Sequence, residues 1–209
     1  SDVYKRQQRN VIYEERRKVL DGEDLQEHVQ HMIRTVVTGE IAGGMAEHHP
    51  ENDKDLQEIL APMAKLFPCE LHYTADELRK LTPDALADAV YDCAMKAYAA
   101  REETFGLQPD GTPLMRELER VVMLRVVDEY WMDHLEAMDD LRQGIGLRAY
   151  GNVKPVDEYK RAGFDMFDEM VNGIQTETVR RLFTVRVRRE QKLERKTVAR
   201  GAVANAGGD

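Results

Sequence analysis

The sequence predicts an all-α fold that combines a long helix, a small helical unit and an antiparallel two-helix arm. Two long amphipathic segments lie between residues 114 and 174, joined by a short loop over residues 146–154. Helix-start signals stand at Thr74, Thr82 and Thr112. Charged residues make up 33% of the chain and aromatic residues 7%, a composition typical of helical proteins with a charged surface.

The first helix of the arm is predicted to start at Thr112 and Pro113, a cap residue followed by a ring that needs no hydrogen-bond acceptor in the first turn. Gly144 and Gly146 are predicted to end it. Over this range the helix would be roughly 48 Å long. Its apolar positions recur at steps of three and four, which places them on one face. They are Leu124, Val127, Trp131, His134, Met138, Leu141 and Ile145.

The return helix is predicted to begin at Pro155, and its short connection favours an antiparallel hairpin. Lys154 stands before it and cannot accept a capping hydrogen bond. The loop carries Arg148 and Tyr150. Tyr150 could fold back onto the arms or contact a partner, and spacing alone leaves both open. The apolar stripe of this helix is Val156, Tyr159, Gly163, Phe167, Met170 and Ile174.

The N-terminal part is predicted to be helical from residue 9 to about 41, with a local bend near Gly22. Its stripe comprises Leu25, Val29, Met32, Val36 and Glu40, widened by Ile33, Val37 and Ile41. His28 and His31 are close in sequence but lack a third ligand at helical spacing. We therefore predict no metal site.

Residues 54–106 are predicted to form a separate small helical unit. Thr74 and Glu77 have the spacing of a capping box, and Thr82 with Pro83 starts a further helix. The two cysteines, Cys69 and Cys93, lie in different predicted elements and belong to no metal-binding motif. We expect both to be buried, reduced thiols, as is usual in a cytosolic protein.

Several function classes have no support in the sequence. The formal net charge of −9 argues against a general nucleic-acid binder. A phosphate-binding GxxxxGK[ST] loop, an HExxH motif and a nucleophile motif are missing, so we expect no active site and no cofactor in this chain. Neither a signal peptide nor a membrane-spanning apolar run occurs, and we expect a soluble, non-exported protein.

Three blocks of the sequence resemble the SecA preprotein translocase family. Residues 119–150, ERVVMLRVVDEYWMDHLEAMDDLRQGIGLRAY, look like the first helix and tip of the SecA two-helix finger, and residues 158–170, EYKRAGFDMFDEM, like its second helix. Residues 11–25, VIYEERRKVLDGEDL, resemble the start of the helical scaffold. The blocks stand in the family's order, and from the first to the last they span most of the chain.

The resemblance implies a domain division and an activity. Residues 1–45 would be the long scaffold helix, 46–111 the helical wing domain, 112–187 the two-helix finger and 188–209 a basic, disordered linker. The parent protein would be an ATP-driven translocase that moves secretory preproteins through the SecYEG channel. ATP and Mg²⁺ would bind motor domains outside this chain.

The resemblance also implies roles for individual residues. Arg148, Ala149, Tyr150 and Gly151 would form the finger tip that contacts the preprotein and the channel. Trp131, Leu124, Met138 and Leu141 would carry scaffold packing that restrains the motor, although plain core packing explains Trp131 as well. The protein would lie in the bacterial cytoplasm, peripheral on the cytoplasmic face of the inner membrane.

The C-terminal segment from Arg180 to Arg200 is strongly basic, with nine Lys or Arg residues against Glu190 and Glu194. It is expected either to be a solvated helix end or to contact anionic lipid. The chain begins at Ser1 without methionine, and Ser1 to Gln7 match the family poorly, so we expect a fragment. The alternative to a translocase fragment is a free-standing helical adaptor or coiled-coil protein whose hairpin docks a partner helix.

Overall fold

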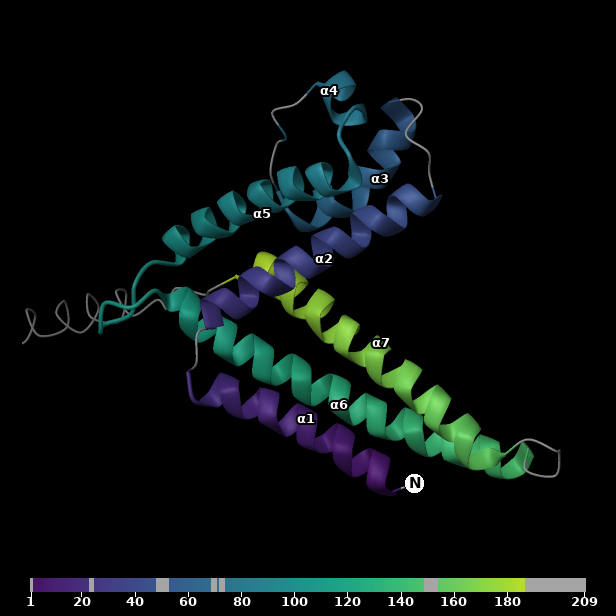
Figure 1. The fold of residues 1–209 in the computed structure, drawn as a ribbon. Coiled ribbons are helices and arrows are strands. Elements are labelled where there is room, and N and C mark those ends of the chain that lie inside the picture. The colour runs from purple at the N-terminus through teal and green to yellow at the C-terminus, as the bar shows by residue number, and fades with distance from the viewer. Residues whose placement is uncertain are drawn as a thin grey trace, which may run out of the picture.

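The structure, a computed structural model, describes residues 2–22, 25–47, 53–68, 71, 74–148 and 154–186. Within these ranges the protein is all-α, which confirms the predicted fold class (Figure 1). None of the described helices is both long and apolar enough to cross a membrane. The helices are α1 (Asp2–Leu20), α2 (Leu25–Glu47), α3 (Asp53–Leu66), α4 (Ala75–Arg79), α5 (Pro83–Phe105), α6 (Leu114–Arg148) and α7 (Pro155–Thr184).

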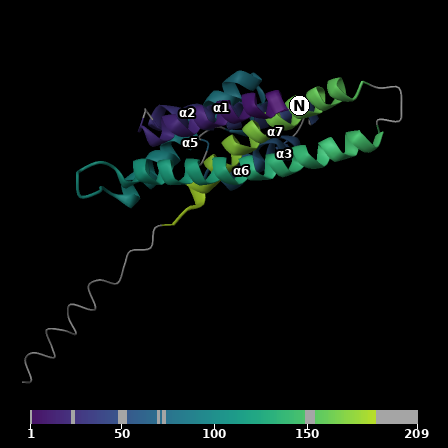
Figure 2. The ribbon, with the colours of Figure 1, turned by 90° about the horizontal axis from the view of Figure 1, so that it is seen from below.

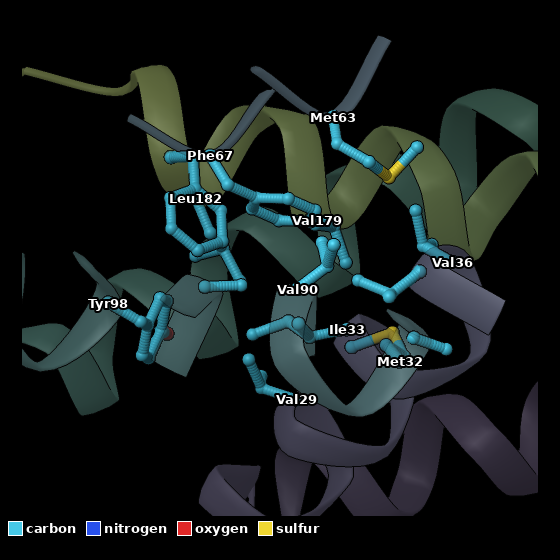
Figure 3. Close-up of a cluster of buried hydrophobic side chains, with 14 of the residues drawn as sticks. Val29, Met32, Ile33, Val36, Met63, Phe67, Val90, Tyr98, Val179 and Leu182 are labelled. Carbon is cyan, nitrogen blue, oxygen red and sulfur yellow. The ribbon is translucent and has the colours of Figure 1, made fainter. Parts of the chain in front are cut away.

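Helix α2 lies at the centre of the main hydrophobic core. It packs against α3, α5, α6 and α7, and Val29, Ile33 and Val37 have no exposed surface. Figure 3 shows side chains of α2 meeting Phe67, Val90 and Leu182 from three other segments of the chain. The wide apolar stripe predicted for α2 is thereby confirmed, except that Glu40 at its end is exposed.

The predicted single helix over residues 9–41 is interrupted. Gly22 adopts φ 72°, a left-handed conformation that glycine tolerates better than other residues, and α1 ends just before it. Helix α1 then lies along α6, whereas α2 packs between α5 and α7 (Figure 1). The bend expected near Gly22 is therefore a true break, which allows the two halves of the segment to cover different partners.

The small helical unit α3–α5 begins its helices as the sequence predicts. Thr74 and Glu77 form a reciprocal capping box at the start of α4. Thr82 caps α5, and Pro83 occupies its first turn. At the other end of α5, Gly106 has φ 77° and its N–H donates to the carbonyl of Glu102. Both ends of α5 are thus fixed by local side-chain and backbone chemistry.

Cys93 on α5 corrects the expectation of two reduced thiols, because it is disulfide-bonded. The other cysteine, Cys69, lies outside the described residues. Phe67, just after α3, and Val90 of α5 line the same cavity, so the end of α3 lies beside the middle of α5. Sequence separation alone cannot show this proximity, since both helices are brought together by packing on α2.

Helices α6 and α7 form the antiparallel arm that the sequence predicts (Figures 1 and 2). Helix α6 has 35 residues and so is roughly 52 Å long. The prediction that Gly144 and Gly146 end it is wrong, because the helix continues to Arg148. Ile145 between them is buried in the arm, and its packing outweighs the cost of about 1 kcal/mol for each helical glycine.

The base of the arm is joined to the small helical unit by Arg101 of α5. Its Nε donates to the carbonyl oxygen of Leu182 at 3.0 Å and its Nη2 to that of Val185 at 2.5 Å. These carbonyls belong to the end of α7, where backbone acceptors have no partners within the helix. Arg101 therefore completes the C-terminal end of α7 and couples it to α5.

Replacing Ile33 with alanine tests the central position of α2. Because Ile33 has no exposed surface, Ile33→Ala should lower the free energy of unfolding by about 2–5 kcal/mol, measured by urea denaturation. The matched control is Leu20→Ala at the end of α1, where the side chain is 50% exposed, with an expected loss below about 1 kcal/mol. Similar losses of stability in both variants would contradict the central position of α2 in the hydrophobic core.

Candidate functional site

The candidate site is the α6–α7 arm and its tip. Arg148 is the last residue of α6, and Lys154 precedes α7 without a side-chain cap, as predicted. The predicted contact residues Ala149, Tyr150 and Gly151 lie outside the described residues, as does the side chain of Arg148. The tip role of these four residues remains a prediction.

The distal half of the arm is held by one small apolar cluster. Met138, Ile145 and Tyr159 are buried there, so Met138 and Ile145 lie on the face that the sequence predicts. A Cβ on Gly163 would lie 3.1 Å from the Cε of Met138, which shows how closely the two helices approach. Val156, predicted to be on the apolar face, is 61% exposed, because it lies in the first turn of α7, before the cluster begins.

A second close approach lies nearer the base of the arm. A Cβ on Gly173 would come within 2.7 Å of Cε1 of Tyr130, closer than two such atoms can lie without movement. Gly163 and Gly173 both belong to α7, and both face large side chains of α6. Large residues on one helix opposite glycines on the other keep the arm narrow and fix the relative position of the two helices.

Trp131 lies in the middle of the arm, 7% exposed, packed with Ile12, Val127 and Met170. Its ring centroid is 5.5 Å from that of His134, which in turn meets Phe167 edge-on at 5.8 Å. Plain core packing therefore accounts for Trp131. Leu124 packs against the main core and Leu141 against the distal cluster. The four predicted coupling residues thus occupy three successive clusters along α6.

Gln8 of α1 connects to both helices of the arm, to His134 of α6 and to the backbone of α7. The Oε1 of Gln8 lies 2.9 Å from His134 Nε2, and the Nε2 of Gln8 lies 3.4 Å from the carbonyl oxygen of Gly163. Because the Gln8 amide donates to Gly163, its oxygen faces the imidazole, and we assign the hydrogen to His134 Nε2. Gln8 and His134 are both buried. One side chain of α1 therefore bridges α6 and α7.

This bridge is not among the predictions made from the sequence. Spacing places His134 in an apolar stripe, and its partner lies on a different helix far away in the sequence. A histidine within an otherwise apolar stripe was the available signal, since a buried imidazole requires a hydrogen-bond partner.

Charged side chains connect the same three helices at the surface. Arg16 of α1 forms a bidentate pair with Asp128 of α6, at 3.0 and 3.2 Å. Arg181 of α7 pairs with Glu129 of α6 at 2.6 Å and with Glu177 at 2.8 Å. The hydrogen bond from Arg180, together with Arg181, lowers the pKa of Glu177 to about 2. The ion pairs to Asp128 and Glu129 hold α6 against α1 and α7.

A buried polar cluster lies where α5 meets the start of α6. Glu119 has no exposed surface and pairs with Arg116 at 3.0 Å. Arg116 also pairs with Glu102 of α5. Burial, reinforced by the negative charge of Glu119, raises the pKa of the Tyr98 hydroxyl. Sequence reasoning did not identify this cluster, because Glu119 is indistinguishable in sequence from the exposed acids of α6.

The part of the chain that the structure describes contains no group of three His, Cys, Asp or Glu side chains able to hold a metal ion. His28 and His31 are exposed on α2. The candidate site is a long double-helical arm that is attached at its base to the main core and contacts α1 along α6.

Comparison with known proteins identifies the family. The family profile described as "SecA Wing and Scaffold domain" matches residues 2–186. The chain is 42% identical over 200 residues to the protein translocase subunit SecA of Clostridium novyi, a match that covers 95% of the chain and 23% of the relative. It is 46% identical over 187 residues to the protein translocase subunit SecA of Frankia casuarinae, a match that covers 89% of the chain and 19% of the relative.

The chain belongs to the SecA family, and the resemblance seen in the sequence is confirmed. A third relative, SecA 1 of Alkaliphilus metalliredigens, is 42% identical over 200 residues, covering 96% of the chain and 22% of the relative. The chain thus spans about a fifth of the length of these curated relatives. The matched region is the one that the family profile describes as wing and scaffold.

The bridge through His134 predicts a pH dependence of stability. Burial lowers the pKa of His134 below its ordinary value of 6.5. Below about pH 6.5 the unfolded chain therefore binds more protons than the folded chain, and the free energy of unfolding decreases. Urea denaturation at about pH 7.5 and about pH 5.5 should show a larger loss for the native sequence than for His134→Gln, which retains a hydrogen-bond donor but does not titrate.

The control for this prediction is His31→Gln, which changes an exposed histidine of α2. It should leave the pH dependence of the native sequence intact. An unchanged pH dependence in His134→Gln would contradict the account of His134 as a buried neutral group.

Proposed function

We propose that the chain is the scaffold, wing and finger region of an ATP-driven translocase that moves unfolded secretory preproteins through the SecYEG channel. Residues 1–45 would form the scaffold helices, 46–111 the wing, 112–187 the finger and 188–209 a basic linker. The observation that carries this proposal is the α6–α7 arm, because it is long, internally packed and attached at its base to a buried core.

The finger tip supplies the contact with substrate and channel in this proposal. Arg148, Ala149, Tyr150 and Gly151 would touch the preprotein, with the Tyr150 ring packing against any passing side chain. Sequence-independent contact of this kind suits a machine that must move many different polypeptides. The distal cluster of Met138, Ile145 and Tyr159 supports the proposal, since it packs the arm close to its end.

Restraint of the motor is assigned to the face of α6 that bears Leu124, Trp131, Met138 and Leu141. These residues pack within the chain, so their influence on a motor domain would be indirect, through the position of α6. ATP and Mg²⁺ would bind in the parent's motor domains and supply the chemical energy there. The chain itself would act as a lever and a restraint.

Anionic lipid is a further proposed partner, through the basic segment from Arg180 to Arg200. Arg180 and Arg181 already pair with Glu177 and Glu129, so lipid contact would depend on the residues beyond them. Arg188, Arg189, Lys192, Arg195, Lys196 and Arg200 lie outside the described residues. The protein would then work in the bacterial cytoplasm, peripheral on the inner membrane.

A titration of the chain into SecA motor domains that lack this region tests the proposal. The rate of ATP turnover should fall as the chain is added and should level off when the motor domains are saturated. The Tyr150→Ala variant of the chain should lower the turnover as much as the native chain does. In a full-length SecA that carries this region, the same substitution should reduce preprotein transport by about tenfold or more, equivalent to roughly 1.4 kcal/mol, while Tyr150→Phe keeps the ring and most of the transport.

Two results would contradict the proposal. A chain that neither binds the motor domains nor changes their turnover has no role in restraint. Equal transport by Tyr150→Ala and Tyr150→Phe would remove the tip ring from the mechanism.

A further inference from the structure

A cavity of about 350 Å³ lies where α1, α2, α6 and α7 meet. Most of its walls are apolar, and four helices contribute apolar side chains to it: Ile12, Met32, Met123, Val127 and Ile174. Small-molecule sites in proteins usually occupy about 300–1,000 Å³, and an apolar cavity of about 150 Å³ can hold a benzene ring. The space therefore suits a single small molecule.

Thr178 of α7 lines this cavity and brings a polar hydroxyl group to a mostly apolar wall. The residue has no exposed surface, and its Oγ1 has no hydrogen-bond partner. A buried hydroxyl without a partner costs about 1–3 kcal/mol, and threonines in helices usually avoid this by bonding to the preceding turn. Thr176 and Thr184 on the same helix do form such bonds. Thr178 is therefore an unused donor and acceptor beside an apolar space.

The hydroxyl can be presented to the cavity by a rotation of one bond. Threonine in a helix populates two χ1 rotamers, which exchange the positions of its methyl and hydroxyl groups. A ligand that carries one polar atom would then satisfy Oγ1, whereas a purely apolar ligand would leave it without a partner.

The mouth of the cavity adjoins a second, shallower basin of about 360 Å³. Glu15, Val19, His28 and His31 line both spaces. The Glu15 carboxylate pairs with Lys18 at 3.3 Å, so its negative charge at the rim is balanced by the lysine. No charged side chain among the described lining residues lies deeper than this rim. Because burial of an unpaired charge is costly, the cavity favours a neutral ligand.

We propose that this cavity binds a small neutral amphiphile, an aromatic or branched aliphatic group that carries one hydroxyl or carbonyl. The apolar part would lie among Ile12, Val127 and Ile174, and the polar atom would bond to Thr178 Oγ1. The ligand would contact α1 and the α6–α7 arm together, and so would stabilise α1 in its place beside the arm. This inference does not depend on the proposed role in translocation.

The test uses benzyl alcohol as the probe and toluene as its matched apolar control. Methyl resonances of Ile12, Val127 and Ile174, followed by ¹H–¹³C NMR, should shift saturably with benzyl alcohol. Thr178→Val keeps the shape but removes the hydroxyl, and should weaken benzyl alcohol binding about three- to tenfold without weakening toluene binding. Thr178→Ser, which keeps the hydroxyl, should preserve the preference for the alcohol.

A substitution at the rim of the cavity tests whether the probes bind inside it. Val11 is 48% exposed and lines the cavity, so Val11→Phe should narrow the entrance and weaken both probes while circular dichroism stays unchanged. Shifts that do not saturate would overturn the proposal. Equal affinity of Thr178→Val and the native sequence for benzyl alcohol would overturn it as well, provided that the variant is folded, which the removal of an unpartnered buried hydroxyl favours.

Discussion

The burial of α2 is the constraint on which the rest of the structure depends. Its apolar stripe is too wide to be covered by one neighbour, and it contacts α3, α5, α6 and α7 at once. The small helical unit and the arm touch each other less than they touch α2. Each isolated helix would be marginal in water, so the shared core around Val29, Ile33 and Val37 is what holds these parts in a fixed arrangement.

The arm gains its stiffness from a different source. Along its length α6 and α7 meet in small clusters, with glycines of α7 opposite Met138 and Tyr130, and α1 braces it through Gln8 and His134. A break at Gly22 is what allows α1 to reach α6 while α2 remains in the core. One glycine thus separates the segment that braces the arm from the segment that anchors it.

Local signals in the sequence predicted the helices well and their contacts poorly. Capping residues at Thr74 and Thr82 and the stripe on α6 were correct, because they depend on neighbouring residues. Two predictions that rest on glycine are wrong. Gly146 does not end α6, because the packing of Ile145 outweighs the cost of a helical glycine, and Gly22 separates two helices instead of bending one. The disulfide at Cys93, the His134 bridge and the buried Glu119 depend on residues distant in sequence, which one sequence cannot pair.

Native-state hydrogen exchange tests the central claim most directly. Amide protons of α2 over residues 29–41 should exchange only through global unfolding, with an opening free energy equal to that from urea denaturation. Amides of the distal arm, over residues 138–148 and 155–163, should exchange earlier, because one small cluster holds them. Exchange of α2 at the same low opening free energy as the distal arm would contradict the claim that α2 is the centre of the structure.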